Sequence, residues 1–397
     1  MLKKIKSSQL LQGMYIHNLK CSWLDHPFAG NKFKLESETD IRKIIVAGIT
    51  EVEIDTSKGL DVFVEKLMER RQYKNKILRS AVDESLAKPA IKVKTHAKDE
   101  TREAKVAFAE AGQLITNMMS DVKMGKQVEM ELVNPVINKM SESILRNHNA
   151  LLGLSRIRIM DKYTFEHSVS IAVLMMSFAK SMAMSDDIIR EVGVGGLLHD
   201  IGKTLTPDEI LNKPGKLTDE EFVIMRRHVV DSRIILEKTP NLSQIALDVA
   251  AQHHERYDGT GYPNRLKGDE ISLYGQMSAI VDVYDAITAN RCYHKGEEPS
   301  VVLKLLMKWS NSHFNPELVQ KFVQSVGIYP AGSLVMLSNH HLAKVIDIEN
   351  NILKPIVEVF LNSKTRSYIS PQIINLRKTD KLKIISAESY NKWNIKP

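Results

Sequence analysis

Histidine and aspartate side chains gather in one stretch of the chain, and both residue types bind metal ions. Five of the 13 histidines lie between residues 167 and 282, and two of the aspartates in this stretch, Asp200 and Asp282, complete the set. The seven are His167, His199, Asp200, His228, His253, His254 and Asp282. Imidazole and carboxylate together suit divalent Fe, Mn, Co, Ni or Zn. Seven ligands exceed what one ion with an open coordination position needs. The set therefore suits two ions, and Asp200 has two carboxylate oxygens with which to bridge them.

Asp200 is the member of this set that a purely structural role explains least well. It follows the apolar run Val192–Leu198, where a buried carboxylate is costly unless it is paired or bound to metal. A lone histidine on a helix is more often a surface or hydrogen-bonded residue. The pair His340–His341 has no acidic neighbour in its strand-like surroundings, and we interpret it in that way.

A helical scaffold is expected to position these ligands. The pattern from about Gly125 to Val326 is almost all helical, with turns at Asn134–Pro135, Asn212–Gly215 and Asn315–Pro316. Thr218 followed by Glu221 forms a capping box, which predicts that a helix starts there.

Four segments differ in pattern, and they predict a mainly α chain with small β-containing ends. Residues 1–60 alternate in MYIHNL and in Glu51–Asp55, which indicates a small α+β domain with a short helix at Asp40–Ala47. Residues 61–124 are a charged helical linker, and residues 125–326 form the helical bundle. Residues 327–397 form a short β-rich tail. Its predicted strands are Ser333–Ser338, Ala343–Ile348 and Ile356–Leu361, with a turn at Asn350–Asn351.

A heptad-like stripe in the linker leaves two interpretations open. Its apolar residues are Phe108, Ala111, Ile115, Met118 and Val122. The stripe belongs either to a helix packed on its own domain or to a coiled coil that forms a homodimer.

Composition limits the class of protein. Hydrophobic residues make up 43% and charged residues 26%, an ordinary globular balance. The two cysteines, Cys21 and Cys292, build neither a disulfide framework nor a thiolate metal site. The longest apolar run, Val169–Ala179, is shorter than the roughly 18–20 residues that cross a bilayer, and the N-terminus lacks an apolar signal core. We expect a soluble cytoplasmic protein without a transmembrane segment.

The net charge of +7 and the pI near 9.1 favour an anionic partner. A phosphorylated small molecule satisfies this sign. No motif of interleaved aromatic and basic residues supports a nucleic acid polymer as the partner.

Several motifs carry a family resemblance. Residues 199–203 read HDIGK and residues 253–263 read HHERYDGTGYP, and YTFEHS, LKGDEI, VDVYDAIT and FNPELV accompany them in order. From about Tyr163 to Val326 the chain resembles the HD-GYP family, bacterial cyclic dinucleotide phosphodiesterases of the HD phosphohydrolase superfamily. GMYIHNL and WLDHPF near the N-terminus resemble a domain of unknown function that often precedes HD-GYP domains.

The resemblance implies two metal sites that share Asp200. One site takes His167, His199, Asp200 and Asp282, and the other takes Asp200, His228, His253 and His254. Some family members add a third ion through a glutamate four residues before the first histidine. That position is Tyr163 here, so two ions are expected. Iron or manganese is expected first, with nickel, cobalt or zinc as alternatives.

The two ions imply a mechanism. A water molecule between two cations becomes a hydroxide near neutral pH, and it attacks phosphorus in line with the departing 3′ oxygen. Lys203 lies one turn beyond Asp200 and is expected to place its ammonium on a phosphoryl oxygen or near the leaving group. Lys203 and Asp200 are therefore the predicted catalytic residues.

Substrate contacts also follow from the resemblance. It assigns them to Gly261, Tyr262 and Pro263, to Asp285 at a guanine edge, and to Arg291, Tyr293, His294 and Lys295. The usual family run is Arg-Pro-Tyr followed by Arg or Lys, whereas this chain has Arg291-Cys292-Tyr293-His294. His294 thus stands where the family has a permanent cation, and Lys295 follows it.

The expected function is metal-dependent hydrolysis of cyclic di-GMP to pGpG, with continued hydrolysis to GMP left open. One alternative is a phosphodiesterase that prefers 3'3'-cyclic GMP-AMP. A second is a cyclic dinucleotide sensor with weak hydrolysis that signals to protein partners through its N-terminal domain or tail. All seven ligands and Lys203 are present, which favours an enzyme.

Overall fold

The computed structural model describes residues 2–7, 10, 12–20, 28, 32–47, 49–59, 97–155, 163–289, 296–348 and 353–395. The chain divides into two compact units, residues 1–80 and 81–397. Among the described residues, no helix combines the length and the apolar character needed to cross a membrane.

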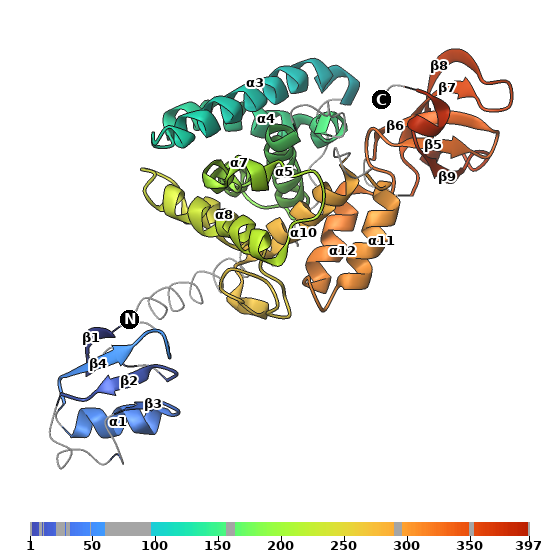
Figure 1. Cartoon of the computed structure of the whole chain (residues 1–397). Coiled ribbons are helices and arrows are strands. Elements are labelled where there is room, and N and C mark those ends of the chain that lie inside the picture. The colour runs from blue at the N-terminus through green and yellow to red at the C-terminus, as the bar shows by residue number, and fades with distance from the viewer. Residues whose placement is uncertain are drawn as a thin grey trace. The chain divides into compact units, whose positions relative to one another are not determined.

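In the described part of the first unit, a four-stranded antiparallel sheet has one helix, α1, beside it (Figure 1). Its elements are β1 (Leu2–Lys6), β2 (Tyr15–Asn18), β3 (Phe33–Lys34), α1 (Glu38–Val46) and β4 (Glu51–Asp55), and the strand order is β1-β4-β2-β3. Ile16, Ile54 and Ile44 are fully buried and join the two central strands to the helix. The prediction of a small α+β domain is confirmed.

The second unit begins with a helical bundle. Its helices are α3 (Ala97–Lys123), α4 (Met130–Ser155), α5 (Tyr163–Ser181), α6 (Asp186–Leu198), α7 (Asp208–Leu211), α8 (Asp219–Glu237), α9 (Gln244–Gln252), α10 (Leu273–Thr288), α11 (Pro299–Trp309) and α12 (Pro316–Val326). Short 3-10 helices η3 (Ile201–Leu205) and η4 (Gly268–Glu270) follow α6 and α9. Figure 1 shows α5 among the other helices, and it contacts α4, α6, α10 and α12. A helix apolar on all sides is stable only when enclosed in this way.

Two glycines set how closely α6 packs against its neighbours. A Cβ at Gly196 would lie 2.9 Å from the Ala172 Cα on α5, and one at Gly195 would lie 2.7 Å from the Val249 Cβ on α9. A larger residue would push α6 away from α5 at position 196 and away from α9 at position 195. This close packing fixes the end of α6, where His199 and Asp200 follow.

The heptad-like stripe of α3 is buried within the chain. Ala111, Ile115, Met118 and Val122 are buried, and α3 packs along α4. The stripe therefore belongs to the core of this unit, and the homodimer stays a prediction that the stripe does not support.

The C-terminal part is a five-stranded antiparallel sheet with the order β8-β7-β6-β5-β9. Its strands are β5 (Leu334–Leu337), β6 (His341–Asp347), β7 (Ile356–Asn362), β8 (Ser367–Asn375) and β9 (Ile384–Glu388). The first three match the predicted strands closely, whereas β8 and β9 were not predicted. Asn350–Asn351 lie outside the described residues. The mainly α fold with a small α+β domain and a β-rich tail is confirmed.

Candidate metal centre

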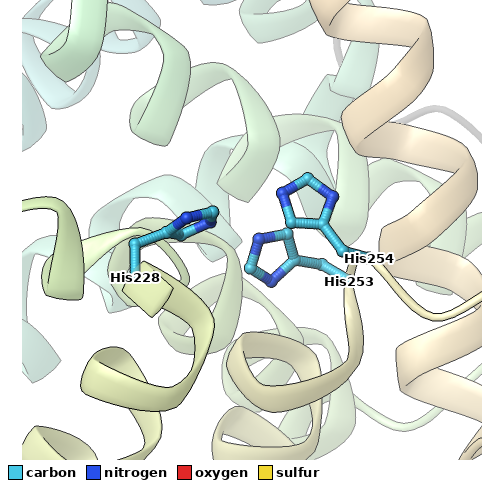
Figure 2. A group of neighbouring side chains, drawn as sticks. All are labelled: His228, His253 and His254. Carbon is cyan, nitrogen blue, oxygen red and sulfur yellow. The ribbon is translucent and has the colours of Figure 1, made fainter. Parts of the chain in front are cut away.

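Five elements bring the seven predicted ligands together. They lie on α5, at the ends of α6 and α9, on α8 and on α10. Their ligand atoms form three overlapping groups, and within each group the atoms lie within 4.8 Å of one another. The groups are His167, His199 and Asp282; His199, Asp200 and His253; and His228, His253 and His254. Figure 2 shows the three rings of the last group close together.

The carboxylate of Asp200 faces two pairs of histidines. Its Oδ2 lies 3.2 Å from His199 Nε2 and 3.6 Å from His167 Nε2. Its Oδ1 lies 3.3 Å from His228 Nε2 and 3.8 Å from His253 Nε2. Each oxygen therefore belongs to a different half of the ligand cluster.

Three of the imidazoles are held in one tautomer by the backbone. The Nδ1 atom of His199 lies 2.8 Å from the carbonyl oxygen of Gly196. The Nδ1 atom of His228 lies 2.6 Å from the carbonyl oxygen of Met225. The Nδ1 atom of His253 lies 2.8 Å from the carbonyl oxygen of Ala250. A carbonyl oxygen only accepts, so Nδ1 carries the hydrogen in each ring. Nε2 is then left with a free lone pair, which is the atom a metal binds.

The same atoms lack any other partner. Among the described residues, His199 Nε2, His228 Nε2, His253 Nε2 and Asp200 Oδ1 are buried without a hydrogen bond. Buried polar atoms are nearly always satisfied in native proteins. Three lone pairs and a carboxylate oxygen in one space fit divalent cations, so the site is able to hold metal.

The electrostatics around Asp200, His228 and His253 favour the protonation states that bind metal ions. Burial tends to raise the pKa of Asp200, but its interactions with His199 and Lys203 hold that pKa well below its usual value. Burial lowers the pKa of both His228 and His253. An ionised carboxylate and neutral imidazoles are the forms that bind metal ions.

Asp285 is hydrogen-bonded to a predicted ligand. Its Oδ2 lies 2.6 Å from His167 Nδ1, while Asp282 Oδ1 lies 3.2 Å from Nε2 of the same ring. Burial tends to lower the pKa of His167, but the hydrogen bonds with Asp282 and Asp285 raise it. Asp285 is only 3% exposed. A carboxylate on the far ring nitrogen commonly orients a metal-binding histidine. The predicted contact of Asp285 with guanine stays a prediction.

Lys203 lies against Asp200. Its Nζ is 2.5 Å from Asp200 Oδ2, and its side chain is partly exposed. The preceding Gly202 lets η3 press against α8, because a Cβ there would lie 2.2 Å from the His228 carbonyl oxygen. The Gly202 N–H also donates to Ser232 Oγ at 2.8 Å.

The loop after α9 places Tyr262 beside the histidines. Its ring lies 4.7 Å from the His254 ring, and its N–H donates to the His254 carbonyl oxygen at 3.1 Å. Pro263 follows, half-buried. Gly261 is required by the close approach of the backbone, since a Cβ there would lie 2.3 Å from the Arg256 nitrogen.

Two residues that support this loop were not predicted. Glu255 is 1% exposed and accepts hydrogen bonds from the N–H groups of Asn264 at 2.7 Å and Leu266 at 3.0 Å. Arg226 lies over the Tyr262 ring, 4.9 Å from its centroid. The sequence signal for Glu255 is a carboxylate directly after the histidine pair. For Arg226 it is a cation two residues before His228.

The predicted substrate contacts Arg291, Tyr293, His294 and Lys295 lie outside the described residues, as does the side chain of Tyr163. These assignments stay predictions.

A helical bundle with an HD pair at its centre, surrounded by imidazoles, defines the class of HD-domain metal enzymes. The sequence-family model of the HD domain matches residues 139–318. The sequence-family model of a domain of unknown function, DUF3391, matches residues 2–133. The four predicted domain boundaries stay predictions.

The chain is similar to the cyclic di-GMP phosphodiesterase PA4108 of Pseudomonas aeruginosa, with 37% identity over 100% of this chain and 94% of that protein. The 3'3'-cGAMP-specific phosphodiesterase 2 of Vibrio cholerae is 44% identical over 32% of this chain and 24% of that protein. Among solved structures, Bd1817, a HDG"Y"P protein from Bdellovibrio bacteriovorus, has a TM-score of 0.48 and 15% identity, and covers 81% of this chain and 98% of that one. From its sequence relatives, the chain belongs to the HD-GYP family of HD-domain proteins.

Proposed function

We infer that the chain is a metal-dependent phosphodiesterase that hydrolyses cyclic di-GMP to pGpG. The observation that carries this inference is Asp200, whose two oxygens face separate pairs of histidines with free Nε2 atoms. The similarity along the whole chain to a cyclic di-GMP phosphodiesterase supports the substrate.

We propose two divalent ions, iron or manganese, with nickel, cobalt or zinc as alternatives. His167, His199 and Asp282 would hold one ion, His228, His253 and His254 the other, and Asp200 both. When bound, the ions supply a hydroxide nucleophile at neutral pH and neutralise charge on the phosphoryl oxygens.

The residues of the chain divide the remaining tasks. Hydrolysis adds water across the P–O3′ bond, which leaves a 5′-phosphate and a free 3′-hydroxyl. The ammonium of Lys203 lies beside Asp200 and is suited to stabilise negative charge that develops on phosphate or on the departing 3′ oxygen. Tyr262 lies next to His254 and is suited to contact the nucleotide.

A second substrate, 3'3'-cyclic GMP-AMP, is supported by two observations. The Vibrio cholerae relative specific for this molecule is 44% identical over 128 residues. In addition, His294 stands where the family usually has a permanent cation, so the contact with guanine nucleotides differs from the common pattern.

Product analysis tests the proposal. The protein is reconstituted with Mn²⁺ or Fe²⁺ and given cyclic di-GMP and 3'3'-cyclic GMP-AMP side by side. We expect about two ions per chain and pGpG as the faster-formed product. GMP in the mixture would show continued hydrolysis. A protein that binds both metals and both nucleotides but cleaves neither would be a sensor, and the proposed activity would be wrong.

A further inference from the structure

Arg226 lies beside the metal centre and has no role in the predicted site. It is exposed on α8, two residues before His228. Its guanidinium carbon lies 4.3 Å from the centroid of the Phe222 ring and 4.9 Å from that of Tyr262. The Tyr262 ring lies 4.7 Å from the ring of His254. One aromatic ring thus separates this guanidinium from a predicted metal ligand.

Two different elements hold the guanidinium in place. Phe222 and Arg226 are four residues apart on α8, so they share one face of the helix. Tyr262 comes from the loop after α9, and its backbone hydrogen bond to His254 fixes its position. A cation over two ring faces is stabilised and loses rotational freedom. The planar group is therefore oriented before any ligand arrives.

The donors of Arg226 are free within the described part of the chain. A guanidinium has five N–H donors. No carboxylate or carbonyl oxygen of the described residues hydrogen-bonds to Arg226 or forms an ion pair with it. Its neighbour Arg227 is different, because Nε lies 3.3 Å from Asp231 Oδ1. An oriented guanidinium with unused donors can donate hydrogen bonds to an acceptor on a bound ligand.

We propose that Arg226 determines specificity by binding the guanine base of the cyclic dinucleotide at O6 and N7. The planar fork of arginine matches these two acceptors, whereas adenine presents an amino donor at the same edge. Asp285, the residue expected at a guanine edge, already has one oxygen on His167. This inference rests on the proposed function, since it requires a guanine-containing substrate.

Kinetics of Arg226→Lys and Arg226→Ala test the inference on two substrates. One is cyclic di-GMP, and the other is bis(p-nitrophenyl) phosphate, a phosphodiester with no base. Lysine keeps the charge but lacks the fork. Both variants should raise KM for cyclic di-GMP by roughly 10- to 100-fold and change kcat little, since one bidentate base contact is worth about 1–3 kcal/mol. The ratio of kcat/KM for cyclic di-GMP to that for bis(p-nitrophenyl) phosphate should fall at least about tenfold.

Arg227→Lys is the matched control, because it changes an adjacent exposed arginine that has its own carboxylate partner. It should leave both constants near those of the wild type. If Arg226→Lys keeps the wild-type KM while Arg226→Ala raises it, the contact is with a phosphate and the base assignment is overturned. An equal loss on both substrates overturns it as well, because Arg226 would then act through the metal centre. A wild-type protein that cleaves bis(p-nitrophenyl) phosphate but not cyclic di-GMP overturns the proposed function, and this inference with it.

Discussion

Three of the predicted ligands, His199, His228 and His253, share one local device. Each donates its Nδ1 hydrogen to the backbone carbonyl three residues earlier, so Nε2 faces the cluster with a free lone pair. The helices thus fix both the direction and the tautomer of these rings. Asp200 lies between them and supplies negative charge to both halves of the cluster. Losing this one carboxylate should therefore affect both proposed metal sites.

Asp200→Asn tests the shared ligand. The substitution keeps the size of the side chain but removes its charge and one ligand oxygen. We expect less bound metal by elemental analysis and a kcat at least about tenfold lower than that of the wild type, because both proposed ions would contribute to the nucleophile. Asp208→Asn changes an exposed carboxylate on α7 and serves as the control. A kcat above about one tenth of the wild-type value would contradict the bridging role.

Asp285→Asn tests whether Asp285 orients His167. The amide oxygen still accepts from Nδ1 but lacks the charge that makes the imidazole a better ligand. Metal titration should show an affinity lower by about 10- to 100-fold, the usual loss when such a partner is changed. If metal affinity is unchanged and KM for cyclic di-GMP rises, Asp285 acts on the substrate, as the family resemblance implies.

At the level of elements, features encoded by neighbouring residues were predictable. Thr218 and Glu221 form the expected capping box of α8, with hydrogen bonds in both directions. The HD pair directly follows α6, whose end is the apolar run Val192–Leu198 noted in the sequence. The contact between His167 and Asp285 joins residues 118 positions apart. No local sequence pattern encodes this contact, and none encodes the contact between Arg226 and Tyr262.

In the C-terminal sheet, strands were predictable only where most of their residues are apolar and buried. β5 is buried throughout, and β6 and β7 are largely buried, so their apolar residues indicated strands. β8 is mostly exposed, with serines, a proline and a glutamine among its residues, and it therefore lacks the apolar alternation. Its pairing with β7 provides the order that its own sequence does not reveal.

Glu255→Gln tests how the loop around Tyr262 is held. The carboxylate accepts two backbone hydrogen bonds while almost fully buried, and glutamine would turn an N–H₂ toward one of these donors. We expect a loss of about 1–3 kcal/mol in the free energy of unfolding, measured with urea. KM for cyclic di-GMP should rise because Tyr262 is displaced. Glu270→Gln, at an exposed turn of the same loop, is the control, and equal effects in both variants would contradict the assignment.

Several polar groups lie around a break in the helix α4. Asn147 leaves the helical conformation, with φ −159° and ψ 106°, and its side chain accepts from the Asn149 N–H at 2.9 Å. Lys180 of α5 donates to the carbonyl oxygens of Ile144 and Leu145 at 2.6 and 3.0 Å. Burial, together with the charge of Lys180, lowers the pKa of His148 to about 3. This histidine therefore stays neutral in the folded state.

His148→Gln should change how stability depends on pH. A histidine whose pKa is lowered by folding contributes stability above its unfolded pKa near 6.5, and that stability is lost as pH falls below this value. Between pH 7.5 and 5.5 the wild type should lose about 1 kcal/mol more free energy of unfolding than the variant. Urea unfolding at both pH values measures the difference. His340→Gln removes an exposed histidine and is the control; equal slopes in wild type and His148→Gln would contradict the burial argument.

At the scale of the whole second unit, the same break joins the helical bundle to the C-terminal sheet. Asp347 ends β6 and is 3% exposed. Its Oδ1 accepts from Asn149 Nδ2 at 2.8 Å, and its Oδ2 accepts from Asn147 Nδ2 at 3.2 Å. The tail is therefore hydrogen-bonded to α4, the helix that precedes α5 and its predicted ligand His167. Packing of the sheet and the local shape of α4 should be coupled.

Asp347→Ala tests this coupling. The substitution leaves two buried amide groups without their charged acceptor, which should cost about 1–3 kcal/mol in the free energy of unfolding for each unsatisfied group that water does not reach. Urea unfolding should show the loss, and limited proteolysis should cleave the variant faster between the bundle and the sheet. Asp380→Ala is the matched control, because its carboxylate is 93% exposed and pairs with Lys354 at the surface, where an ion pair contributes about 0–1 kcal/mol. If Asp347→Ala is as stable and as resistant to protease as Asp380→Ala, the sheet and α4 are not coupled through these hydrogen bonds.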